Sequence, residues 1–123
     1  MTAPAALPQI VESYRGQAFR VSGLRYEGSV LVFRQRTVLW PVAACAEIDP
    51  ASLAAAVAAP GDAVELLLLG CGPRLVPVAP ALRSALKAAG IAVEPMDTGA
   101  ACRTFNVLAA EERRVAAALI AVA

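Results

Sequence analysis

The first third of the chain carries apolar residues in short runs that are typical of β-strands. Val, Phe and Trp, which favour strands, are concentrated in Ala18–Val21, Ser29–Phe33 and Thr37–Trp40. Glycines and the polar segment Arg34–Arg36 separate these runs as turns. We predict that the last two runs pair as an antiparallel hairpin, and the unbroken apolar stretch Val30–Phe33 predicts burial on both faces.

The spacing of apolar residues then changes to that of a helix. Asp49–Pro50 is a helix start, because an aspartate can cap free N–H groups and proline already has the helical φ. Leu53 and Val57 lie four residues apart and share a face. Pro60–Gly61 is predicted to end this helix.

A strand, a helix and a second strand follow. Val64–Leu69 is a continuous apolar run of the kind found in the centre of a sheet, and Ile91–Glu94 is another strand-like run. Between them, the helix predicted over Pro80–Ala89 carries its apolar residues on a single stripe. This order predicts a βαβ unit with two parallel strands.

The last third repeats this arrangement. Ala101, Phe105 and Leu108 have helical spacing and follow a turn expected at Asp97–Gly99. Val115–Val122 is apolar throughout and fits either a helix or a strand. A polar break before it and its β-branched residues favour a strand. The pattern therefore predicts an α/β fold with parallel βαβ units and an N-terminal antiparallel β-hairpin.

Length and composition limit this fold to one domain. The chain has 123 residues, of which 59% are apolar and 5% aromatic, and its net charge is +1. We expect a flexible tail over residues 1–9 and one domain over residues 10–123. The weak charge and scarce aromatics argue against nucleic acid as a partner. Neither a transmembrane segment nor a signal peptide is expected, so we predict a soluble cytoplasmic chain.

Histidine is absent, which removes Ser-His-Asp and Cys-His catalysis and histidine metal sites. Cys45, Cys71 and Cys102 are widely spaced, so neither a disulfide framework nor a metal site is expected, and no cofactor is predicted. Cys102 is expected in the first turn of a helix, and the helix dipole there would lower the pKa of its thiol. Without a conventional base, a buried apolar role is favoured for Cys71 and Cys102, and Cys45 is expected to be structural.

The carboxyl ends of the two parallel strands define a candidate crevice, since ligands of open α/β sheets bind outside these ends. A glycine loop follows the first strand, and the polar segment Met96–Asn106 follows the second. Polar residues three or four apart on a helix share a face, which could bind a small polar or anionic ligand. The candidate ligand-binding residues are Gly70, Cys71, Gly72, Arg74, Asp97, Thr98, Arg103 and Asn106.

Each part of the crevice also has a structural explanation. The glycine loop lacks the third glycine of a dinucleotide fingerprint and the Gly-Lys-Ser/Thr of a P-loop, so its glycines are expected only to permit turns. Asp97 or Thr98 can cap the following helix. A solvated helix surface explains Arg103 and Asn106 as well as a ligand does. The sequence leaves these two interpretations open.

Three segments together resemble a known family: Met96–Asn106, Gly28–Val32 and Glu65–Arg74. They are similar to the Mth-type domain family of unknown function, whose members include the mitochondrial NADH dehydrogenase (complex I) assembly factor three and an adipogenesis-associated cytosolic protein. The similarity extends from about Ile10 to Ala121. It implies a three-layer α/β fold with a mixed central sheet and a final strand at 115–122.

The resemblance also implies a role in protein interaction, and it supplies no catalytic residue. Phe105 stands where the family usually has tyrosine, and Cys71 where threonine is more usual. We therefore expect a small interaction protein that assists assembly of respiratory complex I. Its expected partners are complex I subunits or assembly factors, and such a partner would place the chain at the inner membrane.

An exposed patch of Val, Leu or Trp40 would support this interpretation. The alternative is a ligand-binding domain, or an unrecognised enzyme, that uses the crevice.

Overall fold

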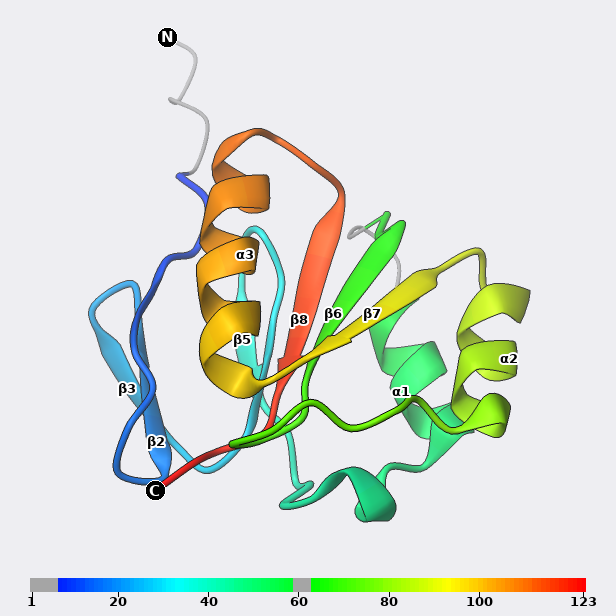
Figure 1. Cartoon of the computed structure of the whole chain (residues 1–123). Helices are drawn as coiled ribbons and strands as arrows, with labels where there is room; N and C mark the ends of the chain where they lie inside the picture. Colours follow the sequence, from blue (N-terminus) through cyan, green and yellow to red (C-terminus); the bar gives the residue numbers. More distant parts are fainter. Residues whose placement is uncertain (1–6, 59–62) are drawn as a thin grey trace, which may run out of the picture.

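A mixed sheet of five strands, in the order β5-β4-β8-β6-β7, forms the middle layer of the structure (Figure 1). The structure is a computed structural model that describes residues 7–58 and 63–123. β6 pairs in parallel with β7 and β8, whereas β4 pairs antiparallel with β5 and β8. The strands are β4 (Val30–Val32), β5 (Thr37–Leu39), β6 (Leu66–Gly70), β7 (Ala92–Met96) and β8 (Val115–Leu119).

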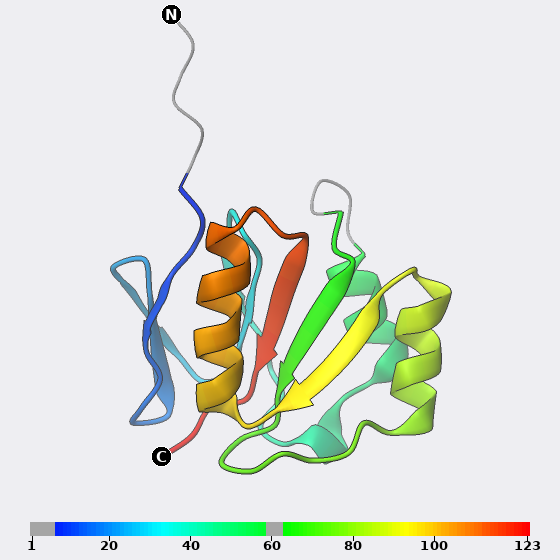
Figure 2. The same cartoon turned by 45° about the horizontal axis from the view of Figure 1, so that its top comes forward.

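Each face of this sheet carries a second layer (Figure 2). The helices α1 (Pro50–Val57) and α2 (Pro80–Ala88) pack on one face, over a core that includes Leu67 and Leu69. On the other face, Leu68 packs in a second core that α3 (Thr98–Ala110) covers. A small antiparallel sheet completes this layer with β1 (Val11–Ser13), β2 (Ala18–Val21) and β3 (Leu24–Glu27). The predicted three-layer α/β fold is confirmed.

The first helix begins where its capping residue predicts. The Asp49 carboxylate accepts hydrogen bonds from the backbone N–H of Ala51, at 3.1 Å, and of Ser52, at 3.4 Å. Leu53 and Val57 are buried, as their spacing predicts. The expected stop at Pro60–Gly61 lies outside the described residues. A short 3-10 helix, η1 (Cys45–Glu47), precedes α1.

The predicted βαβ unit is present as β6, α2 and β7, with the two strands parallel and adjacent. Gly90 ends the helix with φ +79°, a conformation that glycine adopts without strain. The expected turn at Asp97–Gly99 differs from the structure, because α3 already begins at Thr98 with Asp97 as its cap. β8 confirms that the last apolar run forms a strand, but the strand ends at Leu119 and not at Val122 as predicted.

Two strands of the small sheet were not singled out by the sequence pattern. β1 has only three residues, and β3 lies between Gly23 and Gly28, where the pattern indicated turns. Three of the four residues of β3 are exposed, so no buried face produces an apolar signal. Residues 1–6 of the expected tail lie outside the described residues, and at its end the Gln9 N–H donates to the Arg34 carbonyl at 2.7 Å.

The strand directions place four carboxyl ends at one edge of the central sheet. Gly70 and Leu119 are paired at the ends of β6 and β8, and Gly70 is also paired with Met96 at the end of β7. Val30 of β4 pairs with both Leu119 and Leu39. Because β5 and β8 both run antiparallel to β4, β5 ends at the same edge. In the part of the chain that the structure describes, no helix has the length and apolar character needed to cross a membrane.

Candidate functional site

The structure brings together the two loops of the predicted crevice. The Thr98 hydroxyl accepts a hydrogen bond from the Gly72 N–H at 2.9 Å and donates one to the Ile120 carbonyl at 2.7 Å. The Thr98 N–H also donates to the Gly72 carbonyl at 2.8 Å. Since Thr98 is fully buried, these bonds satisfy its polar atoms and fasten the loop after β6 to the start of α3.

Both glycines of the crevice have structural reasons to be glycine. A Cβ on Gly70 would lie 3.0 Å from Leu119 Cδ2 and 3.1 Å from Thr98 Cα, so the backbones of β6 and α3 approach too closely for a side chain. Gly72 has φ +98°, which strains other residues. These two positions let the sheet and α3 meet.

The remaining polar residues of the segment divide into bonded and exposed groups. The Asp97 carboxylate caps α3 by accepting from the Ala100 N–H at 2.9 Å. The Asn106 side chain accepts from the Val11 N–H at 2.9 Å and donates to the Val11 carbonyl at 3.0 Å. Asn106 thus holds β1 against α3, a role that the sequence did not suggest.

Two arginines of the predicted crevice, Arg74 and Arg103, are exposed. Arg103 Nη1 lies 3.3 Å from the position that a Cβ on Gly99 would take, and the Tyr14 hydroxyl lies 2.8 Å from the same point. Both side chains therefore lie over the first turn of α3. Ligand binding by the crevice stays a prediction.

The three cysteines are free thiols. Burial raises the pKa of Cys102 to about 12, and this effect exceeds the lowering influence of the nearby Arg103 guanidinium. Burial likewise raises the pKa of Cys45 to about 11, and the nearby Cys71 thiol adds to the rise. Cys71 itself is buried. Cys102 therefore lacks the low pKa of an activated nucleophile.

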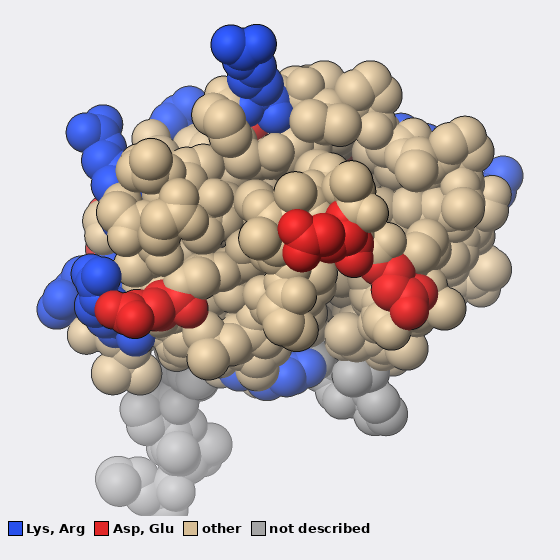
Figure 3. Space-filling model, turned by 90° about the horizontal axis from the view of Figure 1, so that it is seen from below, with Lys and Arg blue, Asp and Glu red and all other residues tan. Residues whose placement is uncertain are grey.

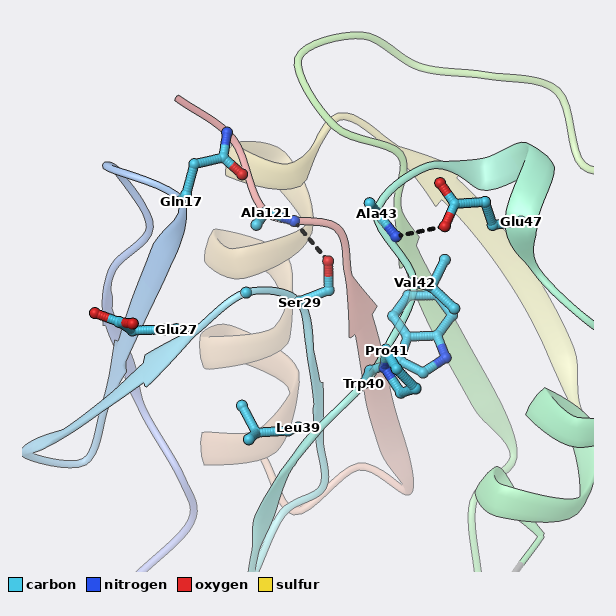
Figure 4. Close-up of a pocket in the computed structure, with 11 residues that line it drawn as sticks. Gln17, Glu27, Ser29, Leu39, Trp40, Pro41, Val42, Ala43, Glu47 and Ala121 are labelled. Carbon is cyan, nitrogen blue, oxygen red and sulfur yellow. Dashed lines mark hydrogen bonds between the residues drawn. The ribbon is translucent and has the colours of Figure 1, made fainter.

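A hollow of about 590 Å³ opens at the same sheet edge, on the side of β4 and β5 (Figure 4). We name it the β3-side hollow. Ser29 and Ala121 lie at its back, where the Ser29 hydroxyl accepts from the Ala121 N–H at 3.0 Å. Leu39 is 62% exposed and points from β5 towards β3. The residues that line the β3-side hollow are Gln17, Glu27, Gly28, Ser29, Leu39, Trp40, Pro41, Val42, Ala43, Glu47 and Ala121.

A second hollow, of about 430 Å³, lies on the other face of β5, against α1. We name it the α1-side hollow. It shares Leu39–Val42 and Glu47 with the β3-side hollow, and it adds Val38 and Asp49 among others. The end of β5 is therefore flanked by open apolar space on both faces.

The charged residues that line these hollows are acidic. Glu27, Glu47 and Asp49 are among the lining residues, which include neither Lys nor Arg in the described part of the chain. Glu27 lies on the β3 side of the first hollow and Glu47 on the opposite side (Figure 4). Figure 3 looks onto this end of the molecule and shows acidic side chains near the centre of a largely uncharged face, with Lys and Arg towards its margin.

The sequence did not identify these hollows. The sequence predicts that an exposed patch would include Val, Leu or Trp40, but Trp40 is only 8% exposed, whereas its neighbour Leu39 is exposed. The available signal was the short strand-like run Thr37–Trp40, which Pro41 follows directly. Proline inside or just after such a run is typical of an edge strand.

No group of three or more Cys, Asp or Glu in residues 7–58 and 63–123 is arranged to hold a metal ion.

Comparisons with known proteins place this fold among related chains. Residues 11–120 match the model of a family described as protein of unknown function (DUF498/DUF598). The chain is 34% identical over 110 residues to NADH dehydrogenase [ubiquinone] 1 alpha subcomplex assembly factor 3 of Xenopus tropicalis, covering 89% of this chain and 60% of that protein. It is 36% identical to an uncharacterized protein of Rhodobacter capsulatus, covering 94% and 85% of the two chains.

Solved structures of similar proteins also match this chain. A crystal structure of a Bordetella parapertussis protein has a TM-score of 0.83 at 37% identity, covering 96% of this chain and 99% of that one. A Bordetella pertussis protein described as a Mth938-like domain has a TM-score of 0.82 at 31% identity, covering 98% and 90%. These likenesses extend over nearly the whole chain.

Proposed function

Because this chain belongs to the DUF498/DUF598 family of unknown function, in which it resembles assembly factor 3, we propose that it is an interaction protein that assists assembly of respiratory complex I. Its partners in this proposal are complex I subunits or other assembly factors, and it meets the inner membrane through such a partner. The chain spans 60% of the length of the Xenopus assembly factor, so the proposal concerns this shared domain.

The observation that carries the proposal is the apolar surface around the end of β5. Leu39 is 62% exposed beside Pro41, which is exposed too, and hollows flank both residues. Exposed apolar residues beside a hollow are a feature that protein-binding sites share. The polar segment of the sequence supports the same view, because Thr98 and Asn106 use their side chains to hold the fold together.

Deletion of the gene in the source organism tests the proposal. Native gels of solubilised membranes, stained for NADH dehydrogenase activity, are expected to show less assembled complex I and more partial assemblies. Restoring the wild-type gene should restore the complex. An unchanged amount of assembled complex I, with no partial assemblies, would overturn the proposed function.

A small polar or anionic ligand at the crevice is the alternative, and the exposed guanidinium groups of Arg74 and Arg103 favour it. Thermal unfolding with panels of metabolites and anions tests this alternative. A ligand present at about 100 times its Kd adds about 2.7 kcal/mol to the free energy of unfolding. A stabilisation that Arg103→Gln abolishes would support the crevice, and the absence of stabilisation across the panels would exclude it for the ligands tried.

A further inference from the structure

We propose that β5 binds an extended, basic and apolar segment of the partner protein as an additional strand of the central sheet. This inference rests on the proposed function and specifies the surface and the kind of partner. Three observations carry it: the backbone of an edge strand, the hollows on its two faces and the charge of their lining.

In the part of the chain that the structure describes, no strand pairs with the outer edge of β5, and the Thr37 hydroxyl donates to the Gln9 side-chain oxygen at 2.8 Å. β5 is the last strand of the sheet and pairs only with β4 among the described strands. The Trp40 N–H donates to the Ser29 carbonyl at 2.8 Å, and the Phe33 N–H donates to the Arg36 carbonyl at 2.7 Å. Because such bonds alternate along an antiparallel pair, the backbone groups of Thr37 and Leu39 face away from β4.

The hollows suit the side chains of an added strand. Successive side chains of a strand point to opposite faces of the sheet. The β3-side hollow and the α1-side hollow lie on opposite faces of β5, with Ser29 lining the first and Leu53 the second. A strand paired with Thr37 and Leu39 would therefore place neighbouring side chains in different hollows. Backbone bonds supply affinity in this mode of recognition, and the hollows supply specificity.

The charge of the surface selects the partner. Both hollows have apolar walls, and the carboxylates of Glu27, Glu47 and Asp49 are the charged groups that line them in the described part of the chain. Asp49 is committed to capping α1, whereas Glu47 accepts one long hydrogen bond, 3.4 Å, from the Ala43 N–H. Glu27 forms a 3.6 Å ion pair with Arg25 in which both side chains are largely exposed. Lysine or arginine residues on either side of an apolar segment would complement these carboxylates.

Pro41 limits the length of the added strand. Proline has no backbone N–H, so the ladder cannot continue through Pro41 as a donor. The pairing surface is therefore short and centred on Thr37 and Leu39. Such a short edge, ended by proline, also discourages unselective edge-to-edge aggregation.

Synthetic peptides test the proposal. The probe is a blocked peptide, Lys-Lys-Val-Leu-Val-Lys-Lys, and binding is followed by the fluorescence of Trp40, the one tryptophan of the chain. We expect saturable binding that weakens with salt, together with slower hydrogen exchange at the Thr37 and Leu39 amides. A peptide with Glu in place of every Lys and a peptide N-methylated at its central backbone amides should both bind at least tenfold more weakly.

Variants locate the interaction. The double variant Glu27→Gln with Glu47→Gln should weaken binding of the lysine peptide about three- to tenfold, because two partly screened charge pairs are lost. Glu94→Gln removes an exposed carboxylate on β7, at the other edge of the sheet, and should leave binding unchanged. Equal binding of the lysine and glutamate peptides, equal binding of the N-methylated peptide, or unchanged exchange at Thr37 and Leu39 would each overturn the inference.

Sedimentation of the free protein tests whether a second copy of the chain occupies the edge of β5. A dimer that Leu39→Arg dissociates would assign the edge of β5 to a second copy and overturn the inference. If peptides fail while deletion of the gene still blocks complex I assembly, only the strand-binding inference falls. If peptides bind while complex I assembles normally without the gene, the proposed function falls and the binding surface remains.

Discussion

The side chain of Asn106 binds the backbone of Val11, although 95 residues separate the two along the chain. Its side-chain amide accepts the Val11 N–H at 2.9 Å and donates to the Val11 carbonyl at 3.0 Å, as a neighbouring strand would. The first strand of the small sheet is thereby fixed to α3.

Replacing Asn106 with leucine is expected to lower the free energy of unfolding by about 1–3 kcal/mol, because both backbone groups of Val11 lose their partners. Urea denaturation measures this loss, and hydrogen exchange at the Val11 amide should accelerate. Asn106→Asp keeps the acceptor but loses the donor to the Val11 carbonyl, so it should also be destabilised at neutral pH and recover part of the loss when the carboxyl is protonated. Unchanged stability and exchange in the leucine variant would show that the amide is not needed to hold β1.

The Thr98 hydroxyl is predicted to stabilise the contact between the loop after β6 and the start of α3. Thr98→Val preserves the shape of the side chain but leaves the Gly72 N–H and the Ile120 carbonyl without their hydroxyl partner. We expect a loss of about 2 kcal/mol or more in the free energy of unfolding, since both groups are buried beside it. Thr98→Ser retains the hydroxyl and is the matched control. Valine and serine variants of equal stability would contradict the structural role of this hydroxyl.

Because the thiol of Cys102 is buried, we predict that the free energy of unfolding depends on pH. Burial raises the pKa of its thiol from 9.0 to about 12. The unfolded chain therefore loses this proton at lower pH than the folded chain. Its contribution is fully present below pH 9 and is lost as the pH rises towards 12.

Urea denaturation at pH 8 and pH 10.5 measures this contribution. Wild type should lose about 1–2 kcal/mol more between these pH values than Cys102→Ala, which lacks the thiol. The variant also corrects for tyrosine and lysine titration. Equal losses in the two proteins would indicate that Cys102 is not protected from solvent in solution.

The sequence was most informative where local signals are strong. Asp49–Pro50 carries its own capping chemistry, and the long apolar run in β6 requires burial, so both were placed from the sequence. β3 was missed because its exposed residues show no apolar period, and it depends on pairing with β2 across the Gly23 turn.

The sequence predicted which loops meet, whereas ligand binding by them stays a prediction. The parallel strands correctly indicated that the loops of Gly72 and Thr98 meet at the carboxyl edge. The partner of Asn106 could not be predicted, because no local pattern connects it with Val11. The hollows beside Leu39 depend on how β3, β5 and α1 assemble, which is a property of the tertiary fold.

Site-specific photo-crosslinking in cells tests the central claim most directly. A photoreactive phenylalanine analogue at Leu39 is compared with the same group at Val107, which is 59% exposed on α3. Mass spectrometry then identifies the captured proteins. We predict that the Leu39 position captures a complex I subunit or assembly factor and that the Val107 position does not. Capture of no such protein at Leu39, or equal capture at both positions, would contradict the proposal that this surface serves complex I assembly.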